Sequence, residues 1–341
     1  MIDPGSFAPD PERARALDLR MRRRLATSLR HVATQCAPYL PVDQAALETR
    51  LARVEHCPAP PALFGAYYEA VFAIEAGELD AAQALLGDII AGPDAESALR
   101  IVALGDPAAD PVAARIQRLV DTDPEAPLRL APPDPERAQA FRARVESALR
   151  LLDAGCPALA AEIRALVREI VLAAPEDPAA TLQFDGASAF MLWGAVVLNA
   201  HMPGSVVEMA QTLAHESAHN LLFGLCAEGP LVENDDDERY SSPLRVDPRP
   251  MDGIVHATFV TARMHYALGA LAGSGTLEAT DRAYAAGALP GLADAVAAGM
   301  ATIEAHGRLT PLGAAVLDGA RRYMAAFAVR ESSGPPPAPP S

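Results

Sequence analysis

The feature that most constrains this chain is a short histidine motif inside a segment with strong helix signals. Ser205-Val-Val-Glu208 is a capping box, in which the serine hydroxyl accepts a bond from the amide of Glu208 and the glutamate carboxylate bonds back to the amide of Ser205. The helix that begins here is expected to run to about Phe223, where a glycine can end it. The run His215-Glu-Ser-Ala-His219 lies in the middle of this predicted helix.

Two histidines at this spacing are typical of a metal site. Residues four apart lie one turn apart on the same helix face, so the imidazoles of His215 and His219 can converge on one ion. Glu216, between them, can act on a metal-bound water or orient groups around the metal. The alternative is two partly exposed helix histidines without a ligand. Since chance matches to H-E-x-x-H rarely fall in the middle of a capped helix, the metal interpretation is favoured.

A third ligand is needed, and the sequence leaves more than one candidate. The short metzincin pattern fails, because Leu222 and Leu225 stand where glycine and histidine are required. Glu233 or Glu238 could serve, although an acidic run of this kind is more often a solvated loop. His256 is the better candidate, because an antiparallel pair of helices could bring it to the same ion. The opposing interpretation of His256 is an ordinary packed histidine.

Composition excludes several classes of function. The 341 residues are half hydrophobic, enough for a packed core in one or two domains. Acidic residues outnumber basic ones by 44 to 28, so nucleic acid and anionic membrane surfaces are not expected as partners. Every basic residue is arginine, which excludes Schiff-base lysine chemistry and a Walker-type phosphate lysine. The four scattered cysteines predict neither a disulfide scaffold nor a cysteine zinc site. No apolar run is expected to approach the roughly 18 residues of a membrane span, so a cytoplasmic location is expected.

The pattern of helix and strand signals predicts a mainly α protein (α+β). It would be multi-helical, with a small β-sheet or hairpin beside a metal-binding helix pair. Helical hairpins are expected over 62–90 and 135–172, joined by a long surface connection, and three alanine-rich helices are expected near the end of the chain. The best strand candidates are 181–184 and 189–199. Four regions follow: a helical N-terminal region (1–175), a metal-site core (176–272), C-terminal helices packing on that core (273–331) and a disordered proline-rich tail (332–341).

Three runs of the sequence together resemble one family. They are residues 215–222 (HESAHNLL), 240–250 (YSSPLRVDPRP) and 252–256 (DGIVH). Over about 193–266 the chain is similar to the H-E-x-x-H peptide-modification proteins, which are encoded beside ribosomally made peptide natural products. The resemblance implies an oxidoreductase of natural-product biosynthesis. It would be an iron(II)- and 2-oxoglutarate-dependent dioxygenase that uses O2 to oxidise, commonly by β-hydroxylation, a side chain of a precursor peptide.

The residues themselves are compatible with that chemistry and with an alternative. Three imidazoles (His215, His219 and His256) leave open positions on an ion, which iron(II) oxygen chemistry needs. Zinc would accept the same ligands, so a zincin-type metallopeptidase remains the alternative, with Glu216 as general base. In the oxygenase, Glu216 would instead orient groups near the iron. A third possibility is a non-catalytic helical binding protein whose motif is accidental.

A 2-oxoglutarate co-substrate requires a cation for its distal carboxylate. With no lysine in the chain, that cation must be an arginine. Arg263 lies seven residues after His256, hence on the same helix face and about 10 Å along the axis. Arg245 and Arg249 on the preceding loop are rivals, and we rank Arg245 and Arg263 ahead of Arg249. The segment from Trp193 to Asn199 has two interpretations: an edge strand beside the site, to which a peptide backbone could add, or plain core packing, which is favoured.

Overall fold

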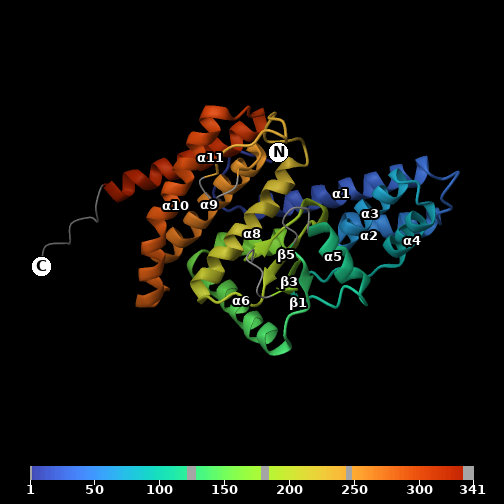
Figure 1. Cartoon of the computed structure of the whole chain (residues 1–341), viewed down its shortest axis with the longest axis horizontal. Coiled ribbons are helices and arrows are strands. Elements are labelled where there is room, and N and C mark those ends of the chain that lie inside the picture. The colour runs from blue at the N-terminus through green and yellow to red at the C-terminus, as the bar shows by residue number, and fades with distance from the viewer. Residues whose placement is uncertain (1, 121–127, 178–183, 243–247, 333–341) are drawn as a thin grey trace, which may run out of the picture. The chain divides into compact units, whose positions relative to one another are not determined.

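A computed structural model describes residues 2–120, 128–177, 184–242 and 248–332. The chain divides into two compact units, each described here by itself. The first, called the sheet unit, spans Asp10–Gly224; the second, called the helical unit, combines Met1–Pro9 with Leu225–Ser341. In the described residues the fold is mainly helical, with eleven α-helices and one small mixed sheet (Figure 1).

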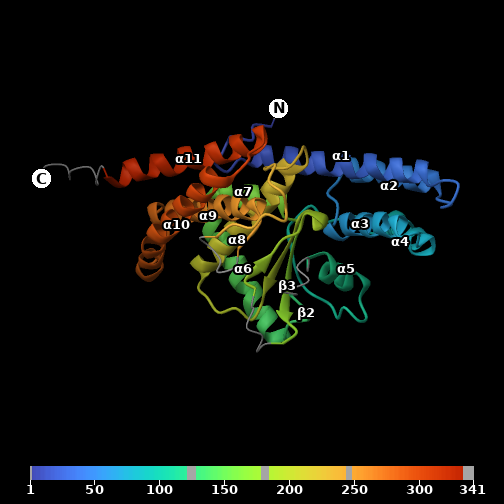
Figure 2. The same cartoon turned by 45° about the horizontal axis from the view of Figure 1, so that its top comes forward.

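The described residues of the sheet unit form eight α-helices and five short strands. The helices are α1 (Pro11–Gln35), α2 (Gln44–His56), α3 (Pro61–Glu75), α4 (Leu79–Ala91), α5 (Pro111–Val120), α6 (Pro135–Gly155), α7 (Pro157–Leu166) and α8 (Val206–Cys226), whose last two residues pass into the helical unit. A 3-10 turn, η1 (Phe190–Leu192), precedes the last strand. Helices α3 and α4 lie side by side as an antiparallel hairpin (Figure 2).

The sheet is mixed, and its strands follow the order β1-β3-β5-β4, with β2 paired beside β3. The strands are β1 (Arg100–Ala103), β2 (Leu130–Ala131), β3 (Glu169–Pro175), β4 (Gly186–Ala187) and β5 (Ala195–Asn199). Strands β1, β3 and β5 are parallel, whereas β4 runs antiparallel to β5 and β2 antiparallel to β3. The two central strands, β3 and β5, are buried on both faces, as parallel strands covered by helices usually are.

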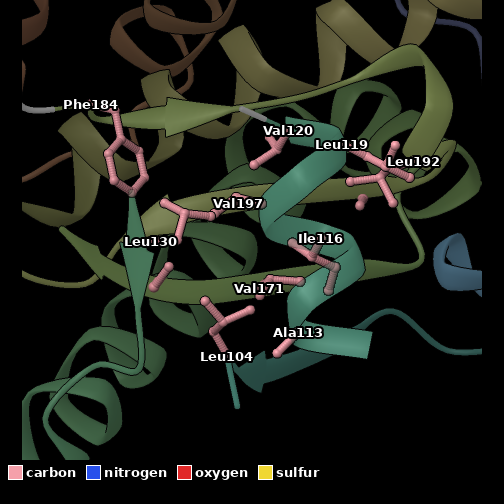
Figure 3. Packing of buried hydrophobic residues seen from close by; sticks show 12 residues of the cluster. Leu104, Ala113, Ile116, Leu119, Val120, Leu130, Val171, Phe184, Leu192 and Val197 are labelled. Carbon is pink, nitrogen blue, oxygen red and sulfur yellow. The ribbon is translucent and has the colours of Figure 1, made fainter. Parts of the chain in front are cut away.

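Helix α5 covers one face of this sheet (Figure 3). Side chains alternate between the two faces of a strand, so Val171 of β3 and Val197 of β5 point to the same side. There they pack in one buried cluster with Ala113, Ile116 and Leu119, which recur at helical spacing along α5. The apolar stripe of the amphipathic helix α5 therefore covers this face of the parallel strands and completes the core there.

The helical unit contains three long helices, α9 (Met251–Gly273), α10 (Ala279–His306) and α11 (Pro311–Ser332). Helix α10 packs along α9 and continues through an internal proline, Pro290. By length and composition alone α10 could also cross a membrane: it has 28 residues and an 18-residue window of mean hydropathy 1.3, of which 22% is buried. The expectation that no segment reaches this length and hydropathy was therefore wrong, because closely spaced alanines, together with larger apolar residues such as Leu289, Leu292 and Met300, keep this helix apolar.

Several expected elements are confirmed and others are corrected. The hairpin formed by α3 and α4 is as expected. The second hairpin ends early, since the residues after Leu166 form the buried strand β3 and not helix. The expected surface connection over 105–135 holds a helix, α5, and a short strand, β2. Near the end of the chain two helices follow α9 where three were expected, because α10 is continuous. Of the strand candidate 181–184, residues 181–183 lie outside the described residues.

Candidate metal centre

The motif helix α8 begins where the capping box predicts and is bonded to the sheet by a buried asparagine. The Ser205 amide donates to the Glu208 carboxylate (2.7 Å), and the Glu208 amide donates to the Ser205 hydroxyl (3.2 Å). Further along α8, the Oδ1 atom of Asn220 accepts from the Gly194 amide (3.1 Å), and its amide nitrogen donates to the Ala195 carbonyl (3.3 Å). Because Asn220 is fully buried and follows the motif directly, these bonds fix the height and rotation of α8 against β5.

Trp193, directly before β5, connects this part of the sheet unit to helix α1. The Trp193 ring is buried, and its indole N–H donates to the Asp18 carboxylate of α1 (3.2 Å). Asp18 also pairs with Arg22 (3.0 Å) and lies 3.5 Å from Arg168. Three donors converge on one buried carboxylate, so its charge is compensated inside the sheet unit. Gly224 of α8 packs against the Trp193 ring so closely that a Cβ there would lie 2.9 Å from it.

His215 and His219 turn toward each other on the open face of α8. Their Nε2 atoms lie 3.2 Å apart, with ring centroids 4.9 Å apart in an edge-on arrangement. Between neutral rings, one Nε2–H can donate to the lone pair of the other Nε2, in a direction that depends on the tautomers. Metal–nitrogen bonds of about 2.0–2.1 Å with a tetrahedral angle place two ligand nitrogens about 3.4 Å apart, and a right angle places them about 3.0 Å apart. The observed spacing therefore fits two ligands of a single ion.

The Glu216 side chain packs against Gly186 of strand β4. Its carboxyl is buried and accepts a bond from the Ser188 hydroxyl to Oε2 (2.7 Å), while Oε1 lies 4.0 Å from the Nε2 atom of His215. Burial raises the pKa of Glu216 to about 7; the Ser188 bond lowers that pKa and the nearby Asp185 charge raises it. At neutral pH this carboxyl can therefore either hold or release a proton, which suits a group that handles protons beside a metal.

Aromatic rings continue the histidine face away from the motif. The Phe223 ring stacks on His219 (centroids 6.2 Å apart), and Phe190 of η1 meets Phe223 edge-on at 6.1 Å. Tyr68 of α3 lies 6.2 Å beyond Phe190, and burial raises its pKa to about 12. These half-buried rings form an apolar wall within the sheet unit that begins at the two histidines.

His256, the third predicted ligand, lies on α9 in the helical unit. Its side chain is 14% exposed, and its Nε2 atom lies 3.7 Å from the Asp252 carboxylate one turn earlier. Burial lowers the pKa of His256, and the Asp252 charge opposes that effect. The ring is therefore held in the neutral form that a metal requires. Because His256 belongs to the other unit, its place beside the His215–His219 pair stays a prediction.

The predicted arginine anchors have different surroundings. Arg263 of α9 is 1% exposed, donates to the Phe7 carbonyl (2.7 Å) and lies over the rings of Phe7 and Tyr266 at 5.7 and 5.9 Å. Arg249 is half-buried, and its backbone exchanges two hydrogen bonds with Tyr240. Arg245 falls outside the described residues. The role of each arginine toward a keto acid stays a prediction.

The acidic run of the helical unit is built around a buried asparagine. The amide nitrogen of Asn234 donates to Glu238 and to the Tyr240 hydroxyl (both 3.0 Å), and its oxygen accepts from the Arg308 amide (2.7 Å). The bonds from Tyr240, Arg308 and Asn234 hold the pKa of Glu238 at about 2. Glu233 is exposed, and its amide bonds to the Arg308 carbonyl. The Glu238 carboxylate therefore already accepts hydrogen bonds from protein donors, among them an arginine and a tyrosine.

Within the described residues, no three His, Cys, Asp or Glu side chains are grouped so as to hold a metal ion. What the sheet unit does bring together is the predicted pair His215 and His219, with Glu216 beside them. Sequence reasoning missed Ser188, which bonds to Glu216 across 28 residues of sequence. Of the two interpretations of Trp193–Asn199, core packing is the one that the structure has: β5 is buried and pairs with β3 on one side and β4 on the other, so of the described strands it is β4 that lies at this edge.

Comparison with known proteins adds no relative. No protein-family model matches the chain, and no curated protein matches it.

Proposed function

We propose that the chain is a metalloenzyme whose ion is held by His215 and His219 of α8 and by His256 of α9. The observation that carries this proposal is the 3.2 Å separation of the two Nε2 atoms on α8, a spacing that a shared ion accounts for. The buried amide bonds of Asn220 support it, because they fix the helix that presents the pair. A ligand set of fixed geometry needs such a support behind it.

We further propose that the metal is iron(II) and that the reaction is a 2-oxoglutarate-dependent oxidation of a precursor-peptide side chain. The similarity of residues 193–266 to the H-E-x-x-H peptide-modification proteins supports this reaction. Bound iron(II) would supply open positions for the keto acid and O2. In the balanced reaction one oxygen atom enters a C–H bond of the peptide, the other enters succinate, and the keto acid loses CO2. The electrons that reduce O2 come from the C–H bond and the keto acid.

The chain's own residues then have distinct tasks. The three histidines orient the ion and leave the remaining positions to the reactants. Glu216, 4.0 Å from His215 and buried against β4, orders a group on the ion or holds a proton there. An arginine (Arg245 or Arg263, ahead of Arg249) pairs with the distal carboxylate of the keto acid.

The test combines spectroscopy with product analysis. Adding 2-oxoglutarate to the anaerobic iron(II) protein should produce a visible charge-transfer band, and O2 with the precursor peptide should release succinate. The peptide product should be heavier by one oxygen. Absence of the band, together with succinate formation no faster than in a His219→Ala control, would contradict the oxygenase.

A zinc metallopeptidase is the second candidate, and one observation favours it. A general base on a zinc-bound water works best with a pKa near the working pH, and the pKa of Glu216 is raised to about 7. Peptide cleavage by the zinc-loaded protein, without keto acid or O2 and lost in Glu216→Gln, would favour this candidate over the oxygenase.

A further inference from the structure

The carboxyl of Glu216 is held in place by two residues outside the H-E-x-x-H motif, Ser188 and Gly186. Ser188 donates its hydroxyl proton to Oε2 (2.7 Å). Gly186 of β4 lies directly under the same group, and a Cβ at Gly186 would fall 2.6 Å from Oε1 and 2.9 Å from Cδ. Contacts this short do not occur between real side chains, so β4 can approach Glu216 this closely only because residue 186 is glycine.

The two oxygens of this carboxyl are not equivalent. Oε2 is held by Ser188, whereas Oε1 lies on the side of the histidines, 4.0 Å from the Nε2 atom of His215. A glutamate on the residue next to a ligand has three rotatable side-chain bonds, and could otherwise swing and ligate the ion itself. The bond to Ser188 removes that freedom, because turning the carboxyl toward the ion would break a buried hydrogen bond.

We propose that Ser188 and Gly186 are positioning residues, which hold the Glu216 carboxyl so that Oε1 faces a metal-bound water or reactant and Glu216 does not become a ligand. The inference rests on the proposed metal centre and deepens it. Strand β4 would then determine whether Glu216 ligates the ion or stays outside its ligand shell. This strand precedes the motif by almost thirty residues and lies at the edge of the described sheet.

The experiment uses cobalt(II), whose visible absorption reports the number and type of its ligands. The full chain is stripped of metal and titrated with cobalt(II) alone, as wild type and as Ser188→Ala, Ser188→Thr, Gly186→Ala, Glu216→Gln and the double variant Ser188→Ala/Glu216→Gln. The wild type should bind one cobalt per chain. Ser188→Ala should keep the cobalt Kd within about threefold, since Ser188 is not a ligand, yet change the absorption spectrum.

The remaining variants separate positioning from structure. Ser188→Thr keeps the hydroxyl and should keep the wild-type spectrum. Gly186→Ala displaces the carboxyl sterically and should change the spectrum. In the Glu216→Gln background, adding Ser188→Ala should change nothing further, because Ser188 acts through the carboxylate. A loss of stability without a spectral change, by contrast, is what a purely structural bond would produce.

Each outcome bears on a different claim. Cobalt bound by the wild type, with an unchanged spectrum in Ser188→Ala, overturns the positioning role and leaves the metal centre standing. A Ser188→Ala change that persists in full in the Glu216→Gln background also overturns it. If the wild type binds no cobalt, the proposed metal centre fails and the positioning role falls with it. If Ser188→Ala does not fold, the Gly186→Ala and Ser188→Thr pair decides the matter in the same way.

Discussion

Helices α8 and α9 both carry histidines predicted to share one ion, but their surroundings differ. On α8 the motif separates into two faces: His215 and His219 lie half-buried on the open face, and Glu216 and Asn220 are buried and bonded to the β4 and β5 side. On α9, by comparison, the residues that follow His256 on the helix are mainly buried in the packing of the helical unit. Arg263 and His265 are buried, and their partners are Phe7 and Tyr323 of the same unit.

This difference shows which residue spacings in the sequence predict contacts in the structure. An i,i+4 pair is set by helix geometry alone, so the convergence of His215 and His219 follows from the sequence. The i,i+7 relation between His256 and Arg263 places both on one face without saying what that face meets. For Arg263 the face includes the Phe7 carbonyl and two aromatic rings, a packing environment that no local pattern predicts.

The largest expected effect tests the attachment of α8. Asn220→Ala leaves the buried Gly194 amide and Ala195 carbonyl without their side-chain partner, so the free energy of unfolding should fall by about 3 kcal/mol. Urea denaturation measures it. Thr212→Ala on the same helix is the matched control and should change the free energy by no more than about 0.5 kcal/mol. Equal effects at both positions would show that Asn220 does not anchor the helix.

The second prediction tests whether Arg263 has a structural role, a role toward the keto acid, or both. Arg263→Met removes the bond to the Phe7 carbonyl and the contacts with two rings, and should lower the free energy of unfolding by about 2 kcal/mol. If Arg263 is also the anchor, the apparent KM for 2-oxoglutarate should rise at least tenfold while iron affinity is nearly unchanged.

The matched variant in the same test is Arg245→Met, at a position that precedes α9 in the sequence. A tenfold rise in KM for this variant, without one for Arg263→Met, would assign the anchor to Arg245 and leave Arg263 as packing. If neither variant changes the KM, the anchor lies elsewhere or the co-substrate is not a keto acid.

The third prediction concerns pH and the buried ring of His265. Burial lowers its pKa to about 4, while Tyr323 bonds to its Nδ1 atom (2.8 Å) and Phe327 packs against the ring. The unfolded chain binds this proton near pH 6.5 and the folded chain only near pH 4. Stability is therefore unaffected above pH 6.5 and falls as the pH drops toward 4, with a slope of up to about 1.4 kcal/mol per pH unit. His265→Phe should remove that component of the slope in urea titrations between pH 7 and 4.5. An unchanged slope would contradict this assignment.

The smallest expected effect tests the capping box of α8. Ser205→Ala removes one of its two reciprocal bonds and should cost about 1 kcal/mol. Ser205→Asp restores an acceptor and should recover most of the loss in thermal unfolding. A loss that Asp does not recover would mean that the serine acts by some means other than capping.

How much the sequence predicted depended on how local each signal was. The capping box and the spacing of the histidine pair lie within one or two turns of helix, and the α3–α4 hairpin joins two helices that are adjacent in the chain; the structure has all three. Strand β3 was read as helix because a strand buried on both faces is a continuous apolar run, without the alternation that marks a half-exposed strand. Strand β1 was missed since its four residues have no glycine or proline at their ends.

Long-range partners could not be predicted in the same way. The bond between Ser188 and Glu216 depends on β4 lying antiparallel to β5, a pairing in which Gly186 lies opposite Leu198. Three helices were expected after α9, but Pro290 lies inside one continuous helix, α10. The contact between Ser188 and Glu216 joins residues 28 positions apart, which no local pattern predicts.

The central claim is that His215, His219 and His256 hold one metal ion, and metal binding tests it most directly. Iron(II) or cobalt(II) is titrated into the metal-free full chain and into the three single alanine variants, with circular dichroism to show that each keeps its helices. We expect one ion per chain in the wild type and at least a hundredfold weaker binding in every variant. Wild-type affinity in His215→Ala or His219→Ala would contradict the metal centre, and a full equivalent of metal in His256→Ala would transfer the third ligand to Glu233 or Glu238.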